Sequence, residues 1–190
     1  DRFIHGMQLL HIGTKTNPAL CKAWEQELIS LFHCIGRRYL YDKKHVTQVE
    51  RLAILMFDKL AKQYGMGERE RLLLRGAAIL HDLGKYICMR SHSTYTYELI
   101  MATDIIGFSD RDKKIIALAA YYHANKLFDE INLKTPAIDK DMVAVVAKLA
   151  TILRLADALD RSYLQKIRQC SVTIKDKAMY VQSYTFRTWV

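Results

Sequence analysis

The segment ERERLLLRGAAILHDLGK, residues 68–85, decides the fold of this chain. Apolar residues crowd the stretch from Leu72 to Leu80 so densely that residues 68–83 are predicted to form a helix with little exposed surface. His81 and Asp82 close this helix, and Gly84 supplies its stop. Two chemically active residues at the end of a buried helix predict a polar site inside a helical domain.

Helical patterns continue on both sides of this segment. Pro18 follows an N-cap asparagine, and Ser109 opens a capping box with Asp112 in place of glutamate. Further helices are predicted over 17–32, 45–65, 109–122 and 139–162. Apolar and polar residues alternate only around 172–181, which predicts a hairpin. We therefore predict an all-α bundle with a small C-terminal β-hairpin.

Composition narrows the classes of function. Subtracting 20 acidic from 29 basic residues gives a net charge of +9 and a pI near 9.4, which favours phosphate-rich partners. The basic residues are scattered and not interleaved with aromatic residues, so a sequence-specific nucleic-acid reader is not expected. No stretch resembles a membrane span. The four cysteines form no CxxC pair, and we expect reduced, mostly packed thiols in a cytoplasmic protein.

Four residues on three predicted helices are candidate metal ligands. His45 lies on an apolar helix face, and Asp157 continues the stripe of Val146, Leu149 and Leu153. A carboxylate in the last turn of a helix opposes the helix dipole, and a carboxylate on a buried stripe loses hydration, so both need a cation. We predict a divalent metal, Mn, Fe, Zn or Mg, held by the following residues: His45, His81, Asp82 and Asp157.

A metal-free structural domain is the alternative. A single inward histidine is commonly a hydrogen-bonded core residue, and Asp157 can pair with Arg161 on a solvated helix face. The metal interpretation depends on the joint pattern, because the candidates come from three separate helices.

The candidate residues carry a resemblance to a known family. His45, the His81-Asp82 doublet and Asp157 follow the signature of the HD superfamily of metal-dependent phosphohydrolases. The surrounding sequence, over residues 36–162, is similar to the C-terminal helical region of the exopolyphosphatase and guanosine pentaphosphate phosphohydrolase (Ppx/GppA) family. The similar stretches are AAILHDLGKYICMRSHSTYTYELI (77–100), IIGFSDRDKKIIALAAYYHANK (105–126) and ILRLADALDRS (152–162).

The resemblance implies a domain organisation. Residues 1–16, with DRFIHGMQLL, resemble the end of the family's actin-like half and would be a remnant of it; residues 17–165 would form the HD-like domain, and 166–190 the hairpin appendage. In the family, hydrolysis of polyphosphate or pppGpp is attributed to the actin-like domains. We therefore expect a module that binds polyphosphate or a nucleotide, contacts the actin-like domains of its parent chain and forms a homodimer.

An independent HD phosphohydrolase acting on nucleotides or phosphomonoesters is the second alternative. In that case Asp82 would orient the attacking water, and Lys85, which follows the wider pattern His-Asp-x-Gly-Lys, would face the phosphate. Arg90 and Lys126 would neutralise charge on the phosphoryl oxygens. A basic track for a longer polyanion is predicted at the following residues: Arg37, Arg38, Lys43, Lys44, Lys113 and Lys114.

The chain departs from the family at one position after the doublet. Tyr95 stands where the family often has a histidine, which argues against a dinuclear site. His92, expected in a polar loop, and His123, on the stripe of Ile116 and Ala119, are candidates for a second metal position or for phosphate binding.

Overall fold

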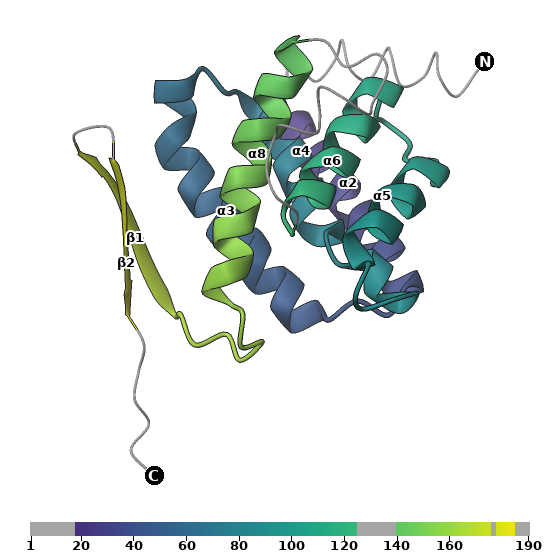
Figure 1. Cartoon of the computed structure of the whole chain (residues 1–190). Coiled ribbons are helices and arrows are strands. Elements are labelled where there is room, and N and C mark those ends of the chain that lie inside the picture. The colour runs from purple at the N-terminus through teal and green to yellow at the C-terminus, as the bar shows by residue number, and fades with distance from the viewer. Residues whose placement is uncertain (1–17, 125–139, 176–177, 185–190) are drawn as a thin grey trace.

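Helices make up most of the structure. The computed structural model describes residues 18–124, 140–175 and 178–184, and the descriptions below are of these residues (Figure 1). They form six α-helices, a 3₁₀ turn and an antiparallel hairpin, which confirms the predicted fold class. The elements are α2 (Pro18–Arg38), α3 (Lys43–Tyr64), α4 (Glu68–Leu80), η1 (Leu83–Tyr86), α5 (His92–Ala102), α6 (Asp110–Tyr122), α8 (Lys140–Leu159), β1 (Gln169–Lys175) and β2 (Ala178–Tyr184).

Helix α4 occupies the centre of the bundle. It packs against α2, α3, α6 and α8, as Figure 1 shows for its place behind α8 and beside α6. From Leu72 to Leu80, only Arg75 is not fully buried. Side chains of the surrounding helices, such as Phe32, Met56 and Leu153, are completely buried, and burial of each contributes about 1.5–3 kcal/mol. The residues that directly follow α4 therefore begin deep inside the domain.

Side-chain caps and a glycine fix the ends of two helices. The side chain of Asp42 accepts hydrogen bonds from the backbone N–H groups of Lys44 and His45, at 2.9 and 3.0 Å. His45 is thereby held in the first turn of α3. Gly65 ends α3 in the left-handed conformation, with φ of 61°, which glycine adopts without strain. The capping box at Ser109 is present as predicted.

The predicted end of α4 was wrong. The helix ends at Leu80 and η1 follows, so Gly84 is not a helix stop. Glycine is required there for another reason: a Cβ atom at Gly84 would lie 1.9 Å from the carbonyl oxygen of His92. The backbone of η1 thus contacts that of α5 directly, and Thr96 joins them by accepting from the Gly84 N–H and donating to the His81 carbonyl.

Helix α5 was not predicted at all, and placing His92 in a polar loop was wrong. His92 is the first residue of α5. The sequence HSTYTYELIMA carries no continuous apolar stripe, and its threonines and tyrosines are not strong helix formers. Packing against α6 and η1 stabilises the helix instead.

The predicted hairpin lies beside α3, apart from the rest of the bundle in Figure 1. Val172 pairs with Val181, and Val172 is buried. The turn at 176–177 and the proposed remnant at 1–16 lie outside the described residues. No helix of the described part of the chain could span a membrane. Cys34, expected to be packed, is exposed, while Cys88 and Cys170 are free and half-buried.

Candidate metal centre

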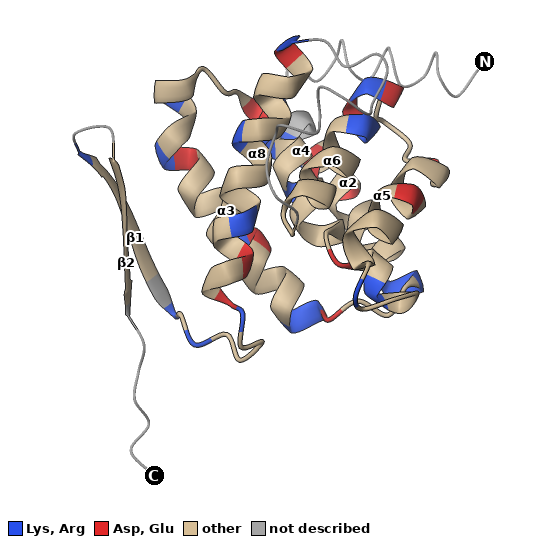
Figure 2. Ribbon diagram, in the orientation of Figure 1, with Lys and Arg blue, Asp and Glu red and all other residues tan. Residues whose placement is uncertain are grey.

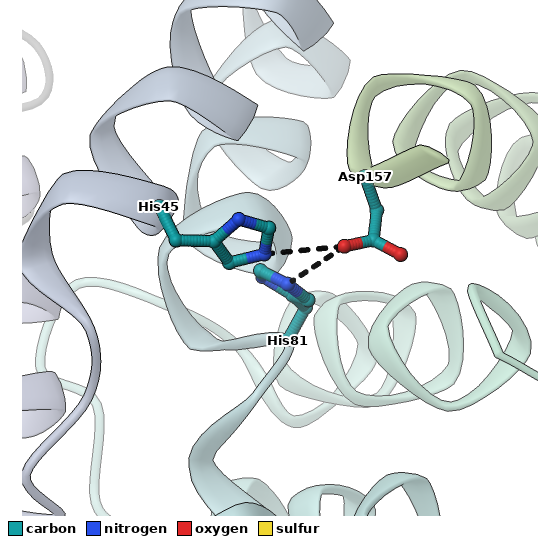
Figure 3. Close-up of side chains that lie close together, drawn as sticks. All are labelled: His45, His81 and Asp157. Atoms are coloured by element: carbon teal, nitrogen blue, oxygen red, sulfur yellow. Dashed lines mark ion pairs between the residues drawn. The ribbon is translucent and has the colours of Figure 1, made fainter. Parts of the chain in front are cut away.

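Two histidines and an aspartate from three helical segments meet inside the bundle. Figure 3 shows His45 of α3, His81 at the end of α4 and Asp157 of α8 pointing toward one another. Asp157 Oδ1 lies 3.2 Å from His45 Nε2 and 3.7 Å from His81 Nε2. Both histidines have no exposed surface. Their ligand atoms lie within 4.8 Å of one another, so this group could hold a metal ion.

Asp82, the fourth predicted ligand, lies at the same point. Its Oδ2 atom is 3.3 Å from His81 Nε2 and 3.8 Å from His45 Nε2. The short turn after α4 directs consecutive side chains, His81 and Asp82, into one space. The structure thus brings all four residues selected from the sequence together.

The two remaining candidate histidines approach the opposite oxygen of Asp82. Asp82 Oδ1 lies 3.7 Å from His92 Nε2 and 4.0 Å from His123 Nε2. His81, Asp82 and His123 form a second group with the spacing of metal ligands. Helix α5 brings His92 here, and the end of α6 brings His123. The Asp82 carboxylate therefore lies between two sets of imidazole nitrogens.

Each histidine is oriented by a hydrogen bond at its other ring nitrogen. His81 Nδ1 lies 2.8 Å from the Ala78 carbonyl, and His123 Nδ1 contacts the carbonyl of Ala120, three residues earlier in each case. These carbonyls lie at helix ends, where they have no partner within the helix. In a neutral imidazole, an Nδ1–H that donates to a carbonyl leaves Nε2 with its lone pair toward the cluster.

His45 is oriented by a carboxylate instead of a carbonyl. Its Nδ1 atom lies 3.0 Å from Asp160 Oδ2, and Asp160 is 1% exposed. Gln165 donates hydrogen bonds to both oxygens of Asp160, at 2.8 Å through its backbone N–H and at 3.1 Å through its side chain. Carboxylates in this position are typical partners of histidines that bind metals. Sequence reasoning missed Asp160, although it stands one helical turn after Asp157.

Three polar atoms at the centre are buried and have no hydrogen-bond partner in the part of the chain that the structure describes. They are His45 Nε2, His81 Nε2 and Asp82 Oδ1. Buried polar groups nearly always have partners, so three such atoms in one place require an explanation. A cation among them would bind the two nitrogen lone pairs and the carboxylate oxygen together.

Electrostatics at the centre favour positive charge. Burial alone would lower the pKa of His81, but the carboxylates of Asp82 and Asp157 outweigh it and raise this pKa to about 10. Burial would raise the pKa of Asp82, yet His81 and Lys85 hold it well below its usual range. Burial, together with the charge on His81, lowers the pKa of His123 to about 3. The carboxylates of Asp82 and Asp157 therefore hold a proton on His81 between them.

Tyr163 and Lys85 form the outer boundary of the centre. The Tyr163 ring stacks on His45, with centroids 3.8 Å apart, and its hydroxyl donates to Asp82 Oδ2 at 3.0 Å. The Lys85 ammonium contacts both this hydroxyl and Asp82 Oδ2. Tyr163 has a φ of 58°, a conformation that bulky residues rarely adopt. No local signal in the sequence predicts this role for Tyr163, because the contact depends on the turn after α8.

The ion pair between Asp157 and Arg161, which would support a structural role for Asp157, is present, but it uses only one oxygen of Asp157. Arg161 Nη1 lies 3.3 Å from Asp157 Oδ2, and the Arg161 side chain is 82% exposed. The other oxygen, Oδ1, faces His45 and His81. Asp157 is thus a buried member of the centre with an exposed ion-pair partner.

The predicted phosphate-binding residues are dispersed. Lys85 borders the centre, whereas Arg37, Arg38 and Arg90 are exposed. Lys126 lies outside the described residues. Figure 2 shows Lys and Arg at both ends of the bundle and on several of the helices that the structure describes.

Comparison with known proteins agrees with this arrangement. The family model described as "Ppx/GppA phosphatase, domain III" matches residues 32–188. The chain belongs to the Ppx/GppA phosphatase family. It is similar to a "Guanosine-5'-triphosphate,3'-diphosphate pyrophosphatase" of Aeromonas salmonicida, with 29% identity over 148 residues and 76% of the chain. The protein of the same description in Aeromonas hydrophila is 28% identical over 145 residues, again 76% of the chain.

The similarity is to one part of those relatives. The chain spans 28% of the length of each. The comparisons therefore identify this chain as domain III of a Ppx/GppA phosphatase.

Proposed function

We propose that this domain III binds divalent metal at the His/Asp centre and uses it to hold a phosphate group in a phosphoanhydride-hydrolysing parent. The observation that supports the proposal is the convergence of unpartnered, buried His45 Nε2, His81 Nε2 and Asp82 Oδ1 on one point. Histidine and carboxylate donors suit Mn, Fe or Zn, and Mg is possible through the carboxylates.

The geometry supports two adjacent metal positions. An imidazole nitrogen has one lone pair, so His81 can bind only one ion. With His81 in the first position beside His45 and Asp157, the second would have His92, His123 and Asp82 Oδ1. Asp82 would contribute a carboxylate oxygen to each position, since Oδ2 faces His81 and Oδ1 faces His92. In this proposal His92 and His123 would take the place of the histidine that the family often has where Tyr95 stands.

The protein's own residues prepare the site for a phosphate. A bound divalent cation would supply a Lewis acid that polarises a phosphoryl oxygen and acidifies water. Asp82 would orient the attacking water. The Tyr163 hydroxyl fixes the Asp82 carboxylate by donating a hydrogen bond to it. Lys85 places an ammonium at the edge of the centre, where it can neutralise an incoming phosphate oxygen.

For the parent protein we propose hydrolysis of phosphoanhydrides such as polyphosphate or pppGpp. The named activity of the Aeromonas relatives supports this class of reaction. Domain III would bind the polyanion there, next to actin-like domains of the same chain and within a homodimer. An independent HD phosphohydrolase is the second candidate, because the complete set of His and Asp ligands is present.

Metal analysis of the purified chain tests the proposal. After incubation with Mn or Zn and removal of excess ion, the chain should retain metal in stoichiometric amount. His81→Ala should lose it, whereas His33→Ala should retain it, because His33 lies on α2 beside Tyr41 and Glu50, outside the centre. Circular dichroism would show that both variants are folded, and His123→Ala provides a second ligand variant. Equal metal content in His81→Ala and the unchanged chain would contradict the proposal.

A phosphatase assay separates the two candidate roles. The metal-loaded chain is incubated with short polyphosphate and with nucleotides, in Mn and in Mg. Metal binding without turnover supports the binding module, whereas turnover that is lost in His81→Ala supports the independent hydrolase.

A further inference from the structure

A pocket of about 400 Å³ adjoins the metal centre. Its floor includes Asp82 and Lys85, so a ligand in the pocket has direct access to the centre. The walls come from the loop between α2 and α3, from η1 and from the turn after α8. Most wall residues are aromatic or apolar: Tyr39, Leu40, Tyr41, Tyr86, Met89 and Tyr163.

These side chains are unusually accessible for their type. Leu40 is 79%, Met89 70% and Tyr86 58% exposed. Large apolar residues grouped around a concave site mark ligand or partner sites on soluble proteins. Tyr39 and Tyr86 meet edge to face, with ring centroids 5.8 Å apart, and Tyr163 presents a third ring beside the centre.

The charge of the pocket does not fit a linear polyphosphate. Lys85 is the single cation among the described residues that line it, and Asp42 and Asp82 add two carboxylates. The basic residues that flank the loop in sequence, Arg37 and Lys43 among them, are not part of the lining. A chain of phosphates needs a cation near each charge. This pocket can therefore accept one phosphate at Lys85 and the centre, and an uncharged group elsewhere.

The aromatic wall is held firmly. The Tyr41 hydroxyl lies 3.0 Å from His33 Nδ1, and the Tyr41 ring packs on Gly36, where a Cβ atom would lie 2.9 Å from it. The next residue, Asp42, caps the helix that carries His45. One loop thus supports both the wall of the pocket and the first ligand of the centre. Tyr41 is therefore a preorganised part of the wall, which the ligand would not have to order.

We propose that this pocket binds the flat heteroaromatic ring of a nucleotide whose phosphate lies on Lys85 and the metal centre. The inference rests on the proposed function for the phosphate end and adds the substrate class: ring-bearing phosphates, not linear inorganic ones. Stacking on tyrosine supplies the ring's affinity, and the pocket volume is in the range typical of small-ligand sites, about 300–1,000 Å³.

Calorimetric titration of the Mn-loaded chain tests the inference. AMP and GMP are compared with ribose phosphate, which has the same sugar and phosphate but no ring system to stack. At least one nucleotide should bind about tenfold tighter than ribose phosphate. Tyr86→Ala should remove this difference without changing ribose phosphate binding, and Tyr86→Phe should keep it. Tyr180→Ala is the matched control, because Tyr180 is 55% exposed on the hairpin and does not line the pocket.

The outcomes distinguish this inference from the proposed function. If the chain binds metal and ribose phosphate but binds the nucleotides no more tightly than ribose phosphate, the proposal that the pocket binds a ring is overturned. The proposal that the centre binds metal then stands. If the chain takes up no metal, titration with adenosine still decides: binding that Tyr86→Ala abolishes supports the ring pocket, and absence of binding overturns it. Equal weakening of nucleotide and ribose phosphate by Tyr86→Ala would also overturn it.

Discussion

Helices α3 and α4 carry two polar clusters that differ in burial and in how their charges are balanced. The first lies toward α2, where Arg75 contacts Glu50 at 2.7 Å and Glu25 at 3.0 Å. Arg71 extends this network to Asp58 at 2.8 Å. Each acid faces an arginine whose geometry suits carboxylates. None of the described groups in this network is among the buried atoms without a partner.

The candidate metal centre lies where α3 begins and α4 ends. Two carboxylates and two imidazoles meet there, and three of their atoms have no hydrogen-bond partner among the described residues. Both clusters combine acids with basic side chains, so residue types alone do not separate them. The difference shows that burial together with unpartnered ligand atoms distinguishes a candidate binding site from a partly exposed ion-pair network.

The largest effect is expected from breaking the ion-pair network. Arg75→Met leaves Glu50, which is 8% exposed, without its cation, and should lower the free energy of unfolding by about 3 kcal/mol. Metal affinity of the folded protein should not change. Urea denaturation and metal titration measure the two quantities. A large loss of metal affinity in folded Arg75→Met would show that the two clusters are not independent.

A smaller effect is expected from Asp160→Asn, which keeps the shape of the side chain that orients His45. Loss of the carboxylate should reduce metal affinity about 30-fold, because partners of metal-binding histidines commonly contribute 10- to 100-fold. Competition with a chelating dye measures this change. Asp141→Asn is a matched control, because Asp141 is exposed in the first turn of α8. An unchanged affinity would mean that Asp160 has only a structural role.

The pH dependence should differ between the metal-free and metal-bound forms. His81 has a pKa of about 10 in the metal-free fold, above its ordinary value of 6.5, so its contribution to stability is complete below 6.5 and is lost as pH rises through 10. An ion must displace this proton, so metal affinity should rise about tenfold per pH unit below 10. Metal titrations at several pH values measure the slope. A flat profile would show that His81 is already neutral.

The smallest effect is expected at Arg161, the exposed partner of Asp157. Arg161→Ala should change stability by no more than about 0.5 kcal/mol, because surface ion pairs contribute little. Metal affinity should change by less than about twofold, since Asp157 Oδ1 keeps its place beside His45. Thermal unfolding and dye competition measure both. A strong loss of stability would favour the interpretation that Asp157 is mainly an ion-pair partner.

Much of the centre could be predicted because its residues carry local signals. His45 lies in a capped amphipathic helix, the His81-Asp82 doublet follows a strongly apolar run, and Asp157 continues a buried stripe. Burial of these positions follows from helical periodicity, which neighbouring residues encode. His92 and Tyr163 lack such signals, because α5 has no apolar stripe and Tyr163 follows the end of a helix.

The sequence by itself determined the helical class, most helix boundaries and the identity of the four primary candidate ligands, because periodicity and capping act between residues a few positions apart. Only the tertiary structure decided which atoms meet. His45 and Asp160 are 115 residues apart in sequence, and their contact depends on how α3 and α8 pack. The position of Asp82 between two sets of imidazole nitrogens and the aromatic pocket arise in the same way, from turns that no local pattern orients.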